Sequence, residues 1–171
     1  MIEWLGETLG NPYLIIVVLT LVPTLELRAS IPYGILVADV HWAVVVVLAI
    51  VVNILLGPIL YEFLDKTMHL LHKIPVFGRL WDRLVARAQK RVHRMVEKYG
   101  IWGLGLFIGV PLPGSGVYTG AMGGYLLGFT RKEFYVATVM GVLIAAVAVT
   151  AVVLTGAETF DFFLKQSHQA G

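Results

Sequence analysis

Two long runs without charge constrain the fold of this chain most. Residues 42–61 and 134–156 contain no Asp, Glu, Lys or Arg. A helix that crosses the hydrocarbon core of a bilayer needs about 20 mostly apolar residues, so each run is long enough to cross once. Trp42 and Tyr61 stand at the two ends of the first run, where aromatic side chains anchor a span at the membrane interface. We therefore expect an all-α integral membrane protein.

Composition supports this class. Of the 171 residues, 58% are hydrophobic and only 14% are charged, whereas a soluble domain usually carries about 25% charged residues. The chain has no cysteine, which excludes disulfides, thiolate metal ligands and thiol nucleophiles. Residues 1–11 carry two acids and no Lys or Arg, so we predict a retained interfacial helix there rather than a secretory signal peptide.

Two shorter apolar runs end at a Val-Pro pair. Residues 12–22 and 101–110 would form only about 15–16 Å of helix, and each is followed by a proline-containing stretch that a continuous helix does not tolerate. Broken backbone at that depth is stable only when it is buried in protein or lines a watery cavity. We therefore predict two re-entrant hairpins, residues 12–41 and 101–130, whose tips meet inside the protein.

The basic residues predict the orientation. Residues 62–100 hold nine of the 13 Lys and Arg, and the helical spacing of apolar residues between 79 and 99 indicates a basic amphipathic helix on the cytoplasmic leaflet. This membrane role explains the charge, so we expect no nucleic-acid partner. With both hairpins re-entrant, the two termini, including the tail 157–171, lie outside. The two hairpin-plus-span units then form an inverted repeat, as in many transporters.

Glu26 and Arg28 are the only ionisable residues expected at half depth. A charge there costs about 2–3 kcal/mol or more unless it is paired or hydrated. In one interpretation, Arg28 binds an anionic head group, because its planar fork can donate two parallel hydrogen bonds to a phosphate, and Glu26 gains and loses a proton during turnover. In the other, an ion pair or a pairing with freed carbonyls holds the hairpin tip together.

The second tip is rich in backbone donors. Gly114, Ser115 and Gly116 precede an expected helical return over residues 117–127, and the first amides of such a helix favour an anion. The alternative is that its glycines only allow close packing. The candidate substrate-binding residues of the two tips are Glu26, Arg28, Ser30, Pro32, Pro111, Pro113, Gly114, Ser115, Gly116, Tyr118 and Thr119.

Other polar or small residues have simpler interpretations. Asn53, in the centre of the first span, is expected to form an interhelical hydrogen bond rather than to contact a ligand. Ala137, Gly141 and Ala145 form a small-residue stripe suited to packing within the chain or in a homo-oligomer. The histidines of the linker lack the spacing of a metal site, and the sequence contains no catalytic triad or carboxylate dyad. We therefore expect a protein that is not an enzyme and needs no cofactor or metal.

Two motifs carry a family resemblance. At Glu26-Leu27-Arg28-Ala29-Ser30-Ile31-Pro32 and Gly109-Val110-Pro111-Leu112-Pro113-Gly114-Ser115-Gly116-Val117-Tyr118-Thr119-Gly120-Ala121, the chain resembles the putative small multidrug export protein family, which is similar in turn to the DedA (VTT-domain) superfamily. The resemblance covers residues 12–156. It implies two facing re-entrant helices and movement of lipids, polyprenyl-phosphate carriers among them, coupled in some DedA members to an ion gradient.

One departure from the DedA pattern limits what the resemblance implies. DedA proteins typically carry acidic residues in the first hairpin and an arginine in the second. Here the second tip has no arginine, and Arg28 lies beside Glu26 in the first. The resemblance therefore implies an acidic role for Glu26 only.

The residues and the resemblance leave three functions open. The leading hypothesis is a transporter or scramblase that moves an anionic lipid, a polyprenyl phosphate or phospholipid, with the head group between the two tips. The second is proton-coupled export of small cations through Glu26. The third is a membrane scaffold without transport, in which Glu26 and Arg28 form an internal pair.

Overall fold

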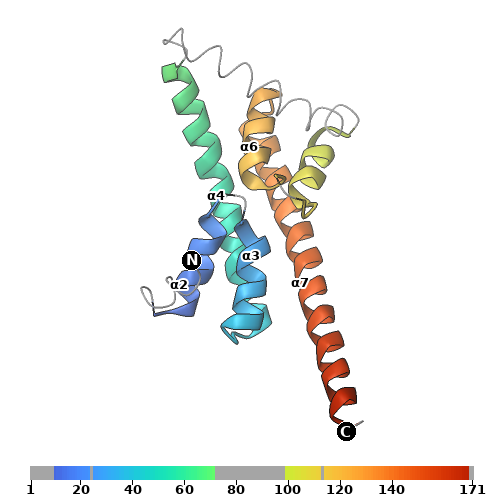
Figure 1. Ribbon diagram of the computed structural model, residues 1–171. Coiled ribbons are helices and arrows are strands. Elements are labelled where there is room, and N and C mark those ends of the chain that lie inside the picture. Colours follow the sequence, from blue (N-terminus) through green and yellow to red (C-terminus); the bar gives the residue numbers. More distant parts are fainter. Residues whose placement is uncertain (1–9, 24, 72–98, 113, 170–171) are drawn as a thin grey trace.

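The computed structural model describes residues 10–23, 25–71, 99–112 and 114–169, and of residues 68–71 and 157–169 it describes the backbone alone. The predicted interfacial helix at residues 1–11 and most of the basic linker lie outside this part. The described residues form helices and connecting turns (Figure 1). The helices are α2 (Pro12–Leu21), α3 (Glu26–Pro32), a π-helical turn (Tyr33–Val37), α4 (Trp42–Leu71), an unlabelled helix Tyr99–Gly109, α6 (Val117–Leu126) and α7 (Arg131–Gln169).

Two of these helices are long and apolar enough to cross a membrane, over Trp42–Thr67 and Arg131–Gly156. The all-α class is thereby confirmed, and the two helices that could span a membrane contain the two predicted spans. Both helices are longer than the predicted spans. The helix α4 passes the predicted end at Tyr61 and α7 passes residue 156, because neither 62–71 nor 157–169 contains a proline or glycine.

The start of α7 has a local cause that the apolar pattern does not reveal. The carboxylate of Glu133 accepts hydrogen bonds of 2.8 Å from both the backbone N–H and the hydroxyl of Thr130. In return the Glu133 N–H donates to the Thr130 hydroxyl at 3.4 Å. This is a capping box, which supplies partners for donors that a helix start leaves free. The helix therefore begins at Arg131, three residues before the predicted span.

The first break is shorter than the polar stretch 23–32 suggests. The helix α2 ends at Leu21, and α3 already begins at Glu26. Pro32 is the last residue of α3, and helical backbone continues beyond it. Because proline has no N–H to bond the carbonyl four residues earlier, the chain continues as the π-helical turn, in which the Ala38 N–H reaches the Tyr33 carbonyl at 3.0 Å.

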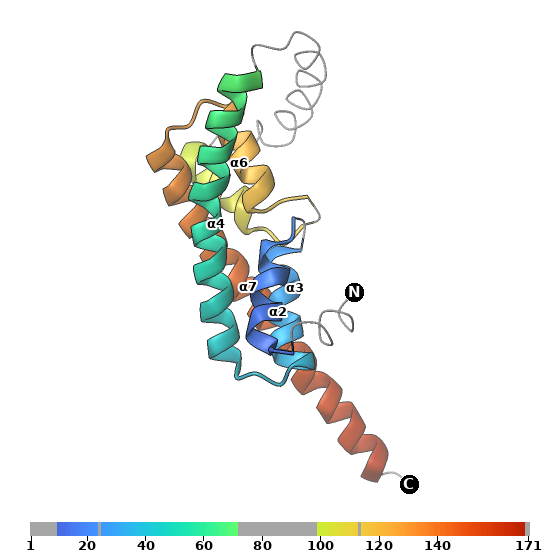
Figure 2. The ribbon, with the colours of Figure 1, turned by 90° about the vertical axis from the view of Figure 1, so that its left-hand side faces the viewer.

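The two hairpins occupy opposite halves of the molecule. Figures 1 and 2 show α2 and α3 side by side along the first half of α4, with α6 beside the other half, toward Leu71. Gly34 allows the turn after α3 to approach α4, since an added Cβ would lie 2.5 Å from Val45 Cγ1. The breaks of the two hairpins face each other between these halves, and they hold the candidate site.

The Ile108 side chain packs against glycines of both α6 and α7, and so brings the second hairpin close to α7. A Cβ on Gly141 would lie 2.6 Å from the Ile108 Cβ and 2.7 Å from the Gly105 carbonyl oxygen. A Cβ on Gly120 of α6 would lie 2.5 Å from Ile108 Cγ1. Ala137, Gly141 and Ala145 thus pack within the chain, where Ala137 and Ala145 are buried.

We predict that Gly141→Ala destabilises the protein, because the new methyl group meets a backbone carbonyl that cannot move aside easily. The unfolding free energy should fall by about 1–3 kcal/mol, the usual cost of overpacking. Thermal unfolding of the purified protein measures this. Gly156→Ala on the same helix is the control, since nothing lies within 4 Å of its added Cβ and alanine favours helix. Equal stability of the two variants would contradict the close packing.

Candidate functional site

The Glu26 carboxylate occupies the start of α6. Its Oε2 accepts a hydrogen bond from the Val117 N–H at 3.2 Å, and its Oε1 accepts one from the Tyr118 N–H at 3.4 Å. The side chain is 3% exposed. These amides are among the donors that a helix start leaves without partners, and a negative charge is stabilised there by the helix dipole. The amides predicted to attract an anion are thus already bound to the chain's own carboxylate.

Reaching α6 requires unusual backbone at both tips. Glu26 has φ +47°, in the left-handed region that non-glycine residues seldom adopt. Opposite it, Gly116 has φ +134°, and a Cβ there would lie 2.6 Å from Glu26 Oε1. Strained residues of this kind persist only where the surrounding structure holds them, and they cluster at functional sites. The close contact between Glu26 and Gly116 is therefore held in place by the surrounding structure.

Arg28 binds the opposite end of the second break. Its guanidinium donates to the carbonyls of Ile108 at 3.3 Å, Val110 at 3.1 Å and Leu112 at 3.3 Å. It also donates to the Ser115 carbonyl and, at 3.0 Å, to the Ser115 hydroxyl. The first two carbonyls lie at the end of the Tyr99–Gly109 helix, where the break at Pro111 removes their helical donors. The observed arrangement is thus the pairing with freed carbonyls, and no ion pair joins Arg28 to Glu26.

Hydroxyl groups complete the junction. The Tyr118 hydroxyl donates to the Leu21 carbonyl at the end of α2. Thr20 donates to the Ser30 hydroxyl at 2.8 Å, which joins α2 to α3. Ser115 fixes its own turn by donating to the Leu112 carbonyl at 2.9 Å. Each broken helix end described so far therefore finds a partner within the chain, and most of the bonds cross between the two hairpins.

The structure gathers most but not all of the predicted site residues. Those that meet at the junction are Glu26, Arg28, Ser115, Gly116 and Tyr118, with Gly114 in the turn (φ +82°) and Thr119 bonded to the Gly116 carbonyl at 3.4 Å. The remainder lie apart from it: Ser30 is buried against Thr20, Pro32 is at the far end of α3, Pro111 is exposed, and Pro113 lies outside the described residues.

Asn53 differs from its prediction. The side chain is fully buried, but neither its Oδ1 nor its Nδ2 has a hydrogen-bond partner among the described residues. The predicted interhelical hydrogen bond is therefore not closed with good geometry, although the amide interacts with the carboxylate of Glu26 on α3. Asn53 lies beside the Glu26 carboxylate, which brings α4 into the site.

One polar cluster was missed by the sequence analysis. Arg131 pairs with Glu62 at 2.9 Å and with Asp65 at 2.8 Å, and so joins the ends of α4 and α7 that lie away from the first hairpin. The capping box at Thr130 is the signal that could have placed Arg131 at a helix start. The cluster is partly exposed and joins α7 to α4 rather than one tip to the other, so it is not part of the candidate site.

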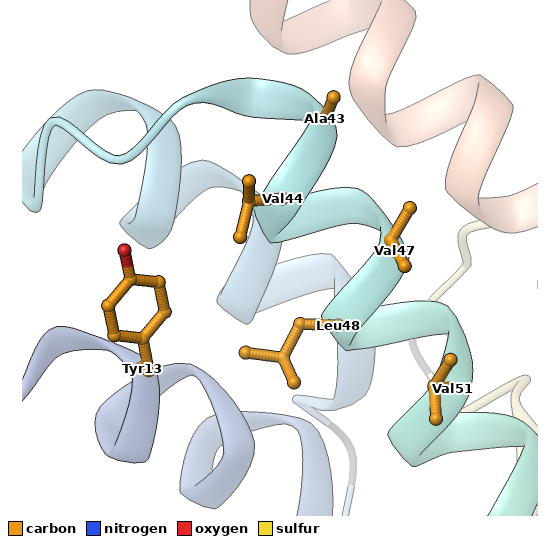
Figure 3. Close-up of a pocket in the computed structure, with 6 residues that line it drawn as sticks. All are labelled: Tyr13, Ala43, Val44, Val47, Leu48 and Val51. Atoms are coloured by element: carbon orange, nitrogen blue, oxygen red, sulfur yellow. The ribbon is translucent and has the colours of Figure 1, made fainter.

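An apolar groove lies between α2 and the first turns of α4, as Figure 3 shows. Its volume is about 680 Å³. The lining residues are Tyr13, Ala43, Val44, Val47, Leu48 and Val51. The Tyr13 hydroxyl is the one polar side-chain group among them, so the groove has little to orient a charged substrate. Nor do the described residues contain a cluster of three or more His, Asp or Glu that could hold a metal ion.

Comparison with known proteins identifies one family. A family model described as "Putative small multi-drug export protein" matches residues 26–148, which is more than two thirds of the chain and includes both tips. Comparisons with curated proteins and with solved structures give no match.

We predict that Arg28→Lys weakens the junction although it keeps the charge. An ammonium has three donors, whereas the planar guanidinium has five in a fixed fork, so several of the hydrogen bonds to the carbonyls of the second break are lost. The unfolding free energy should fall by about 1–3 kcal/mol. Thermal unfolding measures the change, and Arg131→Lys in the exposed cluster is the matched control with little effect. If Arg28→Lys is as stable as the unaltered chain, the capping role is wrong.

We also predict that Gly116→Ala is much more damaging than Gly128→Ala. Both glycines have positive φ, so both variants incur backbone strain of about 1 kcal/mol. Only the methyl group at residue 116 meets the Glu26 carboxylate; nothing lies within 4 Å at residue 128. The extra loss at Gly116, about 2 kcal/mol, would appear in thermal unfolding. Similar losses would mean that the Glu26 contact adds nothing.

Proposed function

The chain belongs to the putative small multi-drug export protein family, and from this premise we propose that it is a membrane transporter that exports small organic cations in exchange for protons. Glu26 is the group that binds the proton and the cation in turn. The observation that carries this proposal is a carboxylate, 3% exposed, held between two broken helical hairpins. Buried carboxylates within the membrane region are costly and mark ion and substrate pathways.

The proposal includes the topology predicted from the sequence. The two hairpins are re-entrant, enter from opposite sides and form an inverted repeat, with the basic linker in the cytoplasm. This is supported by the position of the hairpins in opposite halves of the molecule (Figure 2) and by the length of α2, ten residues, which is about half a span. Transporters of this architecture place their substrate site between such broken helices.

Protonation of Glu26 changes the bonds that hold the tips together. As a carboxylate, Glu26 makes charge-assisted hydrogen bonds to the first amides of α6, and such bonds are about twice as strong as neutral ones. A proton removes the charge and weakens both bonds, so the two tips can part. An organic cation that meets the carboxylate restores the charge by displacing the proton. Proton and cation thus compete for one group, which is the basis of exchange.

The position of Arg28 makes this competition feasible. A cation beside a carboxylate normally repels a cationic substrate. Here the guanidinium is bound by the carbonyls of Ile108, Val110, Leu112 and Ser115, whose negative ends offset its charge. Arg28 serves to hold the second break, and the Glu26 charge is balanced chiefly by amide dipoles.

The same contacts disfavour the two alternatives to different degrees. A lipid phosphate between the tips would have to displace Glu26 from the α6 amides and the carbonyls from Arg28, so transport or scrambling of an anionic lipid has less support. The scaffold hypothesis accounts for the internal bonds as well as the export hypothesis does. It gives no reason for placing a titratable carboxylate at the junction, where a serine or asparagine could also accept the amide hydrogen bonds.

We predict that Glu26→Gln abolishes transport, because glutamine still accepts a hydrogen bond from an amide but carries no exchangeable charge. Liposomes containing the purified protein, with a pH gradient across the membrane, should accumulate a fluorescent organic cation such as ethidium. Glu133→Gln, an equally conservative change at the exposed start of α7, should keep the transport rate.

Three outcomes separate the functions. Loss of cation uptake in Glu26→Gln alone supports export. Movement of a labelled polyprenyl phosphate or phospholipid by the unaltered protein, without cation uptake, would support the lipid hypothesis. A protein that is folded in the liposomes and moves neither kind of molecule would support the scaffold hypothesis.

A further inference from the structure

The Glu26 carboxylate lies among buried residues but has two neighbours that reach the surface. Val117, whose N–H binds it, is fully buried, and Leu27, next to it on α3, is 1% exposed. Arg28 on α3 and Tyr118 on α6 also border the carboxylate, and both are partly exposed. The carboxylate is therefore close to the surface on two sides, beside Arg28 and beside Tyr118.

These two sides are held by very different numbers of hydrogen bonds. The Arg28 guanidinium makes five hydrogen bonds to the second break. The Tyr118 hydroxyl makes one among the described residues, to the carbonyl of Leu21, which is 42% exposed at the end of α2. Each hydrogen bond stabilises a folded structure by only a small net amount. The side held by one bond therefore opens far more often than the side held by five.

Tyr118 also binds Glu26 directly. Its backbone N–H donates to Glu26 Oε1 at 3.4 Å, while its hydroxyl donates to the Leu21 carbonyl. One residue of α6 is thus tied to both helices of the first hairpin, to α3 through its backbone and to α2 through its side chain. When a proton on Glu26 weakens the first bond, the hydroxyl bond is the stronger of the two links that remain.

We propose that Tyr118 is the gate of the transport site: its hydroxyl bond to the Leu21 carbonyl closes the approach to Glu26, and breaking this bond opens it. The inference rests on the proposed function, in which Glu26 exchanges a proton for an organic cation. With the bond made, the end of α2 and the start of α6 stay together beside the carboxylate. With the bond broken, the tyrosine ring turns aside and the carboxyl group becomes accessible.

The test is the rate at which a lipid-soluble carbodiimide labels Glu26 in the full chain in liposomes. The carboxyl O–H adds across a C=N bond of the reagent, and the acyl group then moves to nitrogen, so the whole reagent stays attached and mass spectrometry detects it. Glu26→Gln gives the background. We expect Tyr118→Phe, which keeps the ring and removes only the hydroxyl, to be labelled about fivefold faster, because one lost hydrogen bond raises the open fraction by about that factor.

Tyr61→Phe is the matched control. The Tyr61 hydroxyl also donates to a backbone carbonyl, that of Phe129, at the opposite end of α6 from Glu26. This variant should be labelled at the rate of the unaltered chain. An unchanged rate in Tyr118→Phe overturns the proposal, and so does an equal increase in both variants, which would mean that either loss loosens the whole protein.

Repeating the measurement at acidic pH separates access from proton binding. Once Glu26 is protonated in every variant, the faster labelling of Tyr118→Phe should persist. A difference that disappears there would mean that the hydroxyl acts only on the affinity of Glu26 for a proton, and it would overturn the gate. Labelling does not use transport, so an absence of cation uptake contradicts the proposed function, whereas an unchanged labelling rate contradicts this inference.

Discussion

The structure depends on one constraint: a helix that ends inside the protein, away from water, leaves backbone groups that need partners from the rest of the chain. The chain contains two such breaks, and side chains of each hairpin pair with the free backbone groups of the other. The first hairpin supplies Arg28 to the carbonyls at the end of the Tyr99–Gly109 helix and Glu26 to the amides at the start of α6. The second hairpin returns the Tyr118 hydroxyl to the last turn of α2. Each hairpin therefore supplies hydrogen-bond partners to the broken helix ends of the other.

Much of the remaining packing follows from this exchange. For short polar bonds to form across the junction, the hairpins have to lie close to the spans that support them. Gly34 allows the first to approach α4, and Gly141 allows the second to approach α7. Gly116 then leaves room for the carboxylate itself, and Glu26 adopts left-handed backbone to reach it. Gly116 thus makes room for a charged side chain, whereas Gly34 and Gly141 make room for the apolar packing that supports the junction.

Hydrophobic length and proline position predicted the helices, the two spans and the places where the half-length helices break. Those features are local, so sequence spacing reveals them. The partners of Glu26 and Arg28 could not be predicted, because a bond between residues 80 or more apart depends on the depth and rotation of two hairpins that are each set by packing. The same reason applies to Asn53, whose central position indicated burial but not the absence of a partner. The polar stretch suggested a break that lasts until Pro32, whereas α3 already begins at Glu26. The pattern missed this because the π-helical turn after Pro32 lets helical backbone continue although proline has no N–H.

The exchange of partners between hairpins also sets an order of events during synthesis. Arg28 emerges from the ribosome before its acceptors, which follow 80 to 87 residues later. At about 5–20 residues per second, this interval lasts several seconds. Throughout it, the N-terminal half contains a broken helix and two charges whose partners do not yet exist. The first hairpin therefore completes its hydrogen bonds only late in translation, once the second hairpin has been made.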